Sequence, residues 1–308
     1  MIMQKAGIAR FVFIGIIIVV LLGVINSATA LALGFVFACF FTNPYPSASK
    51  KGIKWLLKIA VIGLGFGISF AEALQANVNS LGLLSCSVIL TVIIGTLVAK
   101  MFAVPNILGF LITSGTAICG GSAIAAVSPV VRADSKQISV ALAIVFALNS
   151  LALLIFPPLG KWLGLTQQQF GIWSAIAIHD TSSVVGAAMS YGDEALKIAT
   201  TLKLSRTLWI IPVALFAAFY FNSKGQKIAI PYFIGGFVLA ILINSSGVLS
   251  PTITAGVVTV AKHLLLVTLF LIGSTLSPSD LKVIGVKPLL FAVGLWLTIS
   301  IGSLLYIY

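Results

Sequence analysis

The sequence predicts an all-α polytopic membrane protein, because it is too apolar for a water-facing fold and its apolar residues occur in long runs. Of its 308 residues, 60% are hydrophobic and 8% are charged, and the mean hydropathy is +1.19. Soluble domains carry about 25% charged residues, so lipid must serve as the solvent for this chain. The runs lack the alternation of polar and apolar residues that a membrane β-barrel requires.

About eleven hydrophobic segments follow one another, each long enough to cross or nearly cross the bilayer as a helix. They cover residues 8–25, 28–42, 53–71, 81–101, 105–131, 137–160, 168–190, 194–221, 230–244, 252–276 and 286–307. The first segment resembles a secretory signal, with Lys5 and Arg10 before it and small residues at 27–30 after it. We interpret it as a membrane span, because the rest of the chain is equally apolar.

The basic residues predict the orientation of the chain. Although the net charge is +12, Lys and Arg occur singly or in small groups around the connection at 50–58 and beside the first, eighth and tenth segments. The loops at 26–29, 71–80 and 245–252 carry none. The positive-inside rule therefore places the N-terminus in the cytoplasm and the C-terminus outside. The same distribution argues against nucleic acid as a partner.

An internal repeat relates the two ends of the chain. Gly34–Ala38 reappears as Gly236–Ala240, a shift of 202 residues, and a shift of 208 residues places Lys54 on Lys262 and Gly65 on Gly273. The copies begin an odd number of segments apart, so we expect opposite orientations, as in the inverted repeats of secondary transporters. The predicted organisation is a single transporter domain over residues 1–308, with repeat units at about 34–98 and 236–305 flanking a central core at 105–221.

A weaker match, at a shift of 60 residues, lies within this core and places Ala117–Ser122 on Ala177–Ser182. If both central segments cross the membrane, they run parallel. If each is a re-entrant hairpin, they enter from opposite faces, and the chain has nine spans plus two hairpins. The sequence leaves both arrangements open.

The first candidate site interrupts the segment at 105–131, where small and hydroxylic residues surround two adjacent glycines. Such residues weaken a helix, and a broken backbone is tolerated at membrane depth only inside protein or along a cavity. A helix that restarts there offers free N–H groups and a positive dipole end to an anion. The alternative is that small residues merely allow close helix packing. We predict substrate binding by Thr116, Cys119, Gly120, Gly121 and Ser122.

The second candidate site interrupts the segment at 168–190. Ionisable residues within a span are costly and are therefore functional candidates. We expect His179 or Asp180 to be the coupling group, and Thr181, Ser182 and Ser183 to contact the substrate. The alternative is that these residues cap the helix that begins after them.

Lys203 and Arg206 are three residues apart and share one face of the next helix. They are either snorkelling anchors near the membrane edge or inward charges that hold an anionic substrate. Arg206 is nearer the apolar stretch at 208–221 and has a planar fork of donors, so we assign it to the substrate and Lys203 to the rim.

No cofactor or metal site is expected, because the two histidines and three cysteines are scattered and lack CxxC spacing. The expected partners are a small anion, the lipid bilayer, a coupling proton or sodium ion, and a second copy of the chain in a homodimer.

Four motifs resemble the YeiH-type family of bacterial membrane proteins, proposed to export sulfate. The matching stretches are Thr116–Ala126, Pro129–Asp134, Ile178–Val185, and Lys203–Arg206 followed by Ile211-Pro212. The resemblance extends from about residue 30 to the C-terminus. Many members carry His-Glu, followed by Gln, where this chain has His179-Asp180 and Ser183. The resemblance implies a location in a bacterial cytoplasmic (inner) membrane and a link to sulfate or sulfonate metabolism.

These observations together predict a secondary transporter, and no enzyme, that moves a small anion by alternating access. Sulfate, a related sulfur oxyanion or a small organic anion is the expected substrate. One alternative is a cation/proton antiporter in which Asp180 binds the ion. Another is an intramembrane hydrolase built on Cys119, His179 and Asp180.

Overall fold

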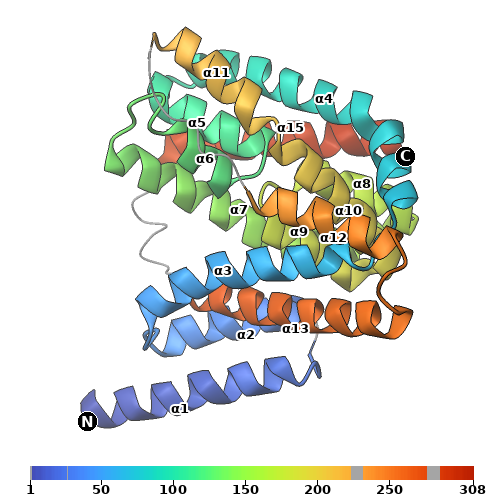
Figure 1. The fold of residues 1–308 in the computed structure, drawn as a ribbon. Coiled ribbons are helices and arrows are strands. Elements are labelled where there is room, and N and C mark those ends of the chain that lie inside the picture. Colours follow the sequence, from blue (N-terminus) through green and yellow to red (C-terminus); the bar gives the residue numbers. More distant parts are fainter. Residues whose placement is uncertain (1, 26, 223–231, 276–284) are drawn as a thin grey trace. The chain divides into compact units, whose positions relative to one another are not determined.

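The computed structural model describes residues 2–25, 27–222, 232–275 and 285–308. This part of the chain is helical and contains no strand, which confirms the predicted all-α class. The helices in chain order (Figure 1) are α1 (Ile2–Leu21), α2 (Ser27–Phe40), α3 (Pro46–Gly65), α4 (Phe70–Met101), α5 (Asn106–Ala117), α6 (Gly121–Val127), α7 (Ser135–Trp162), α8 (Gln167–Ala177), α9 (Thr181–Tyr191), α10 (Asp193–Thr207), α11 (Ile210–Tyr220), α12 (Phe233–Ser245), α13 (Pro251–Thr275) and α15 (Val286–Ile307).

Each of the eleven predicted segments overlaps at least one of these helices. Among the described residues, five helical stretches are long and apolar enough to cross a membrane, and a sixth arises if α3 and the start of α4, bent by 106°, form one span. The five stretches are Ser80–Met101, Ser135–Trp162, Asp193–Tyr220, Pro251–Thr275 and Val286–Ile307. The number of spans stays a prediction, as does the orientation, for which the lysines at 224, 227 and 282 lie outside the described residues.

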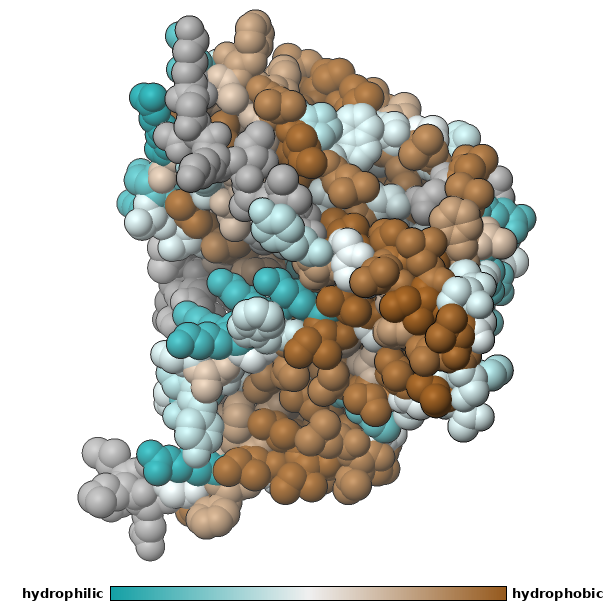
Figure 2. Space-filling view, viewed as in Figure 1, coloured by the Kyte–Doolittle hydropathy of each residue, from teal (hydrophilic) through white to brown (hydrophobic). Residues whose placement is uncertain are grey.

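Many large apolar side chains point outward, as a lipid-solvated protein requires. Phe11, Met101 and Phe219 are 82%, 81% and 86% exposed. Figure 2 shows such side chains gathered over wide areas of the visible face, with polar residues in smaller groups.

The helices form two compact units, and the first unit contains α1, α2, α3, α12 and α13. Its helices approach closely at two glycines. A Cβ added to Gly34 in α2 would lie 3.0 Å from the Cα of Gly273 in α13. A Cβ added to Gly65 in α3 would lie 2.8 Å from the carbonyl oxygen of Phe237 in α12. Only glycine permits these approaches of backbone to backbone.

These two crossings correspond under the predicted repeat. A shift of 202 residues relates α2 to α12 and a shift of 208 relates α3 to α13. The repeat therefore carries the α2–α13 contact onto the α12–α3 contact. The glycines that match in the sequence therefore occupy equivalent packing positions. The opposite orientation of the two repeats stays a prediction.

The second unit contains most of α4, then α5 to α11, and α15. Capping boxes start two of its long elements, with Asp134 and Gln137 at α7 and Thr166 and Gln169 at α8. The Trp173 ring of α8 stacks on Phe156 of α7 at 4.3 Å between centroids, and its indole N–H donates to the carbonyl of Ser300 in α15. These contacts fix α8 against two neighbouring helices and so position the site at its end.

Candidate substrate site at two helix breaks

The first predicted break is confirmed. Helix α5 ends at Ala117 and α6 begins at Gly121. Between them, Gly120 has φ +63°, a left-handed conformation that favours glycine. The N–H of Gly120 still donates to the carbonyl of Gly115, which closes the end of α5 before the chain turns away.

The second predicted break is confirmed as well. Helix α8 ends at Ala177 and α9 begins at Thr181, with Asp180 in extended backbone between them. The Asp180 carboxylate accepts hydrogen bonds from the backbone N–H groups of Ser182 at 3.1 Å and Ser183 at 3.4 Å, and from the hydroxyl of Ser182. Asp180 is therefore the N-cap of α9, as the capping alternative expected.

The two breaks lie against each other within the second unit. A Cβ added to Gly120 would be 3.4 Å from both the Cα and the Cβ of Asp180. The structure thus brings Cys119 and Gly120 beside His179 and Asp180, although about sixty residues separate them in the sequence. We call the place where these two breaks meet the crossing. Its depth along the membrane normal stays a prediction.

Asn149 of α7 joins this crossing and was missed in the sequence. Its side-chain oxygen accepts from the N–H groups of His179 at 3.0 Å and Asp180 at 3.1 Å, the two backbone donors that the break in α8–α9 leaves free. A signal was present, since an amide in the middle of the apolar run at 140–156 is costly unless it has a partner.

The C-terminal end of α8 is held by three buried side chains. The Lys203 ammonium donates to the carbonyls of Ala175 at 3.3 Å and Ile178 at 2.7 Å. Arg206 donates to Ala175 and Ile176, and the Trp296 indole donates to Ala177 at 3.0 Å. All four carbonyls that a helix end leaves without backbone partners are therefore satisfied.

Arg206 also holds the end of α5. Its Nε donates to the carbonyl of Ala117 at 2.7 Å, and its Nη2 lies 3.4 Å from the carbonyl of Thr116. One guanidinium therefore bridges the negative dipole ends of both interrupted helices. The sequence pointed to Arg206 as a substrate contact, whereas the structure shows most of its donors bound to backbone carbonyls.

The interpretation of Lys203 as a snorkelling residue at the rim is wrong. Both Lys203 and Arg206 have 0% exposure. The sequence could not show this, because the partners of both side chains are backbone carbonyls at the ends of α5 and α8, which carry no residue-specific signal.

The remaining predicted residues divide by exposure. Thr116, Cys119, Thr181, Ser182 and Ser183 are buried, whereas Ser122 is exposed and Gly121 is half-buried. The Cys119 thiol is hydrogen-bonded with the Thr207 side chain of α10. The structure therefore gathers most of these residues around the crossing, with Ser122 turned outward.

Several buried polar atoms at the crossing have no hydrogen-bond partner among the described residues. They are Nδ2 of Asn149, both ring nitrogens of His179 and the hydroxyl of Thr116. Asn149 and His179 are 2% and 0% exposed. Buried polar groups are rarely left without partners, so these atoms mark a place where a ligand or water completes the hydrogen bonding.

The crossing carries an excess of positive charge. Among the described residues, the carboxylate that interacts with Lys203 is that of Asp180. Of the other acidic residues, Glu72 lies near the start of α4, Asp134 at the N-cap of α7, and Asp193 and Glu194 at the start of α10. With both basic side chains protonated, two cations against one carboxylate leave a net positive charge, which is costly in a dry interior and favours an anion nearby.

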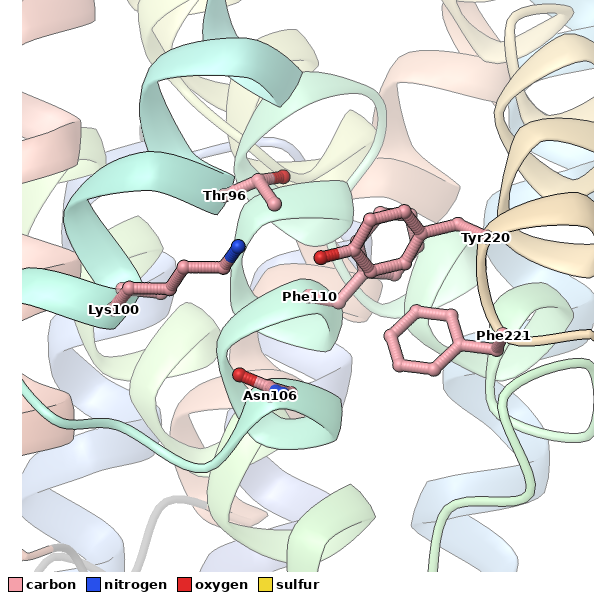
Figure 3. Close-up of a pocket in the computed structure, with 7 residues that line it drawn as sticks. Thr96, Lys100, Asn106, Phe110, Tyr220 and Phe221 are labelled. Carbon is pink, nitrogen blue, oxygen red and sulfur yellow. The ribbon is translucent and has the colours of Figure 1, made fainter.

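A separate hollow lies elsewhere in the second unit (Figure 3). It is lined by Thr96, Ala99, Lys100, Asn106, Phe110, Tyr220 and Phe221. The ammonium of Lys100 and the hydroxyl of Tyr220 point toward each other across it. None of the residues of the two breaks lines this hollow.

Comparison with known proteins places the chain in a family. A family model described as "Conserved hypothetical protein 698" matches residues 6–292. UPF0324 membrane proteins of Bacteroides thetaiotaomicron, Vibrio parahaemolyticus and Shewanella oneidensis are 48%, 50% and 48% identical to it. The alignments cover 92%, 91% and 97% of this chain and 87%, 92% and 94% of the relatives. No solved structure matches the chain. The chain therefore belongs to the Conserved hypothetical protein 698 family of UPF0324 membrane proteins, which is the YeiH-type family that its motifs resemble.

Proposed function

We propose that this protein is a secondary transporter that carries a small anion across the bacterial cytoplasmic membrane by alternating access. The substrate class is a small oxyanion, such as sulfate, a related sulfur oxyanion or a small carboxylate. The anion binds at the crossing of the α5–α6 and α8–α9 breaks, beside Asn149 and His179.

The charge at the crossing carries this proposal. Lys203 and Arg206 are fully buried, and in the part of the chain that the structure describes Asp180 is the carboxylate that interacts with Lys203. Binding an anion there offsets the remaining positive charge, whereas binding a cation adds to it. This argument favours anion transport over cation/proton antiport, the alternative that rested on Asp180.

The polar groups support the same substrate class. The amide Nδ2 of Asn149, the hydroxyl of Thr116 and a ring N–H of His179 are donors without partners among the described residues. Oxyanions offer several acceptor atoms and can satisfy more than one such donor. Arg206 contributes positive charge and holds the two helix ends in place. The other three donors contact the anion directly.

Flux into proteoliposomes tests the proposal. Purified protein is reconstituted, and uptake of radiolabelled sulfate, sulfite, acetate and sodium is measured with and without a pH gradient. We expect saturable uptake of at least one anion and no uptake of sodium on its own. Sodium flux that depends on the protein and exchanges for protons, with no anion flux, would show that the cation alternative is right.

A matched pair of variants links the flux to the crossing. Lys203→Met removes one buried positive charge, and we expect anion uptake to fall by at least about tenfold. Lys100→Met removes a positive charge from the separate hollow and should leave uptake within about twofold. If the two substitutions changed anion uptake equally, transport would not depend on the charge at the crossing.

A further inference from the structure

We propose that the Asp180 carboxylate is a tethered competitor of the transported anion for the N-terminus of α9, so that an anion binds only when Asp180 is protonated and leaves this position. The inference rests on the proposed function and adds the way in which the anion is coupled to a proton. One proton enters the site with each anion bound.

The geometry shows which group occupies the N-terminus of α9. The N–H groups of Ser182 and Ser183 point at Oδ2 of Asp180, with donor–acceptor distances of 3.1 and 3.4 Å, and the Ser182 hydroxyl donates to the same atom. The N-terminus of a helix is a ready-made site for an oxyanion. Here, one oxygen of the protein's own carboxylate fills it.

A second observation shows that the carboxylate leaves part of this site unused. The Asn149 side chain lies at the break, because its oxygen accepts from the N–H groups of His179 and Asp180. Its Nδ2 is buried and has no partner among the described residues, and the same holds for both ring nitrogens of the neighbouring His179. An anion with three or four oxygens can reach donors at the break that a single tethered carboxylate does not satisfy.

Two anions cannot share these donors. With Asp180 ionised, a bound oxyanion would meet a like charge at hydrogen-bond range, in an interior that screens charge poorly. Protonation removes this repulsion and converts the Asp180 carboxylate into a weaker acceptor for the N–H groups of Ser182 and Ser183. The donors then become available to the anion.

The charged and titratable groups around Asp180 fit this exchange. They are Lys203 of α10 and the thiol of Cys119 in the first break, and Arg206 lies near the neighbouring His179. Helix α7 contributes the uncharged Asn149. When a proton and a monovalent anion enter together, the net charge of the crossing is unchanged, because the bound anion replaces the charge that Asp180 gives up. A divalent anion such as sulfate lowers the net charge by one and so also offsets the excess positive charge.

The test counts protons on binding. Purified protein is titrated with sulfate, and separately with acetate, by calorimetry between pH 5 and 8 in buffers of different ionisation enthalpy. We expect the wild type to take up about one proton per anion, with affinity falling about tenfold per pH unit once Asp180 is ionised in the free protein. Asp180→Asn should bind with an affinity independent of pH and without proton uptake, and Asp180→Glu should keep the uptake.

Asp134→Asn is the matched control. The Asp134 carboxylate also caps a helix, because it accepts a hydrogen bond of 2.7 Å from the backbone N–H of Gln137, but it lies at the start of α7, away from the crossing. It should keep the wild-type proton count. Proton uptake that persists in Asp180→Asn, or wild-type binding that does not depend on pH, would overturn this inference while leaving anion transport intact. Absence of binding and flux for every anion at every pH would overturn the proposed function itself.

Discussion

Arg206 is predicted to be the most sensitive position in the second unit. Arg206→Gln removes the donors to Thr116, Ala117 and Ile176, while Ala175 keeps its bond from Lys203. Each buried carbonyl left without a donor costs about 1–3 kcal/mol, and these costs are not additive within one network. We therefore expect a loss of about 3–5 kcal/mol in the free energy of unfolding, comparable to the loss of a buried ionic partner.

Thermal unfolding of the purified protein in detergent measures this loss. A change of this size should lower the midpoint by roughly 5–15 °C. Arg206→Lys should recover little of it, because a single ammonium cannot span the ends of both α5 and α8. Lys100→Gln, in the separate hollow, should shift the midpoint by less than about 2 °C. An Arg206→Gln midpoint within about 2 °C of the wild type would refute the assignment of Arg206 as the bridge between the two breaks.

Three further outcomes are expected. Gly120→Ala should lower the free energy of unfolding by about 1–2 kcal/mol in the same assay, because φ at this position is +63° and an L-residue is strained there. Cys119→Ser should keep most anion uptake if the thiol only packs against α10, whereas complete loss would revive the hydrolase alternative. A fusion of alkaline phosphatase to the C-terminus should be active and a fluorescent-protein fusion dark, because the positive-inside rule places this end outside the cytoplasm.

The helical class and the positions of the breaks were predictable because they depend on local composition. Continuous apolar runs predict helices, and Gly120-Gly121 and His179-Asp180 are local interruptions of such runs. The weak match at a shift of 60 residues placed the two interruptions in register, and α5 and α8 indeed end at Ala117 and Ala177.

The partners of the site residues were not predictable in the same way. Lys203 and Arg206 bind carbonyls of residues whose side chains are small or aliphatic, such as Ala117 and Ala175. Backbone acceptors have no sequence signature, so only the structure shows that both side chains are fully buried. Asn149 was detectable as a polar residue in an apolar run, but its role depends on two N–H groups contributed by another segment.

The two kinds of helix end at the crossing are stabilised by groups of different character, and this difference suggests which end changes during transport. The C-terminal ends of α5 and α8 are held by Lys203, Arg206 and Trp296, donors that are fully buried or nearly so. The N-terminal end of α9 is held by Asp180, a partly exposed carboxylate that one proton can neutralise. A substrate anion can replace a carboxylate in kind, but it cannot replace a cation. The C-terminal ends are therefore suited to hold the crossing together, and the N-terminus of α9 is suited to exchange its partner.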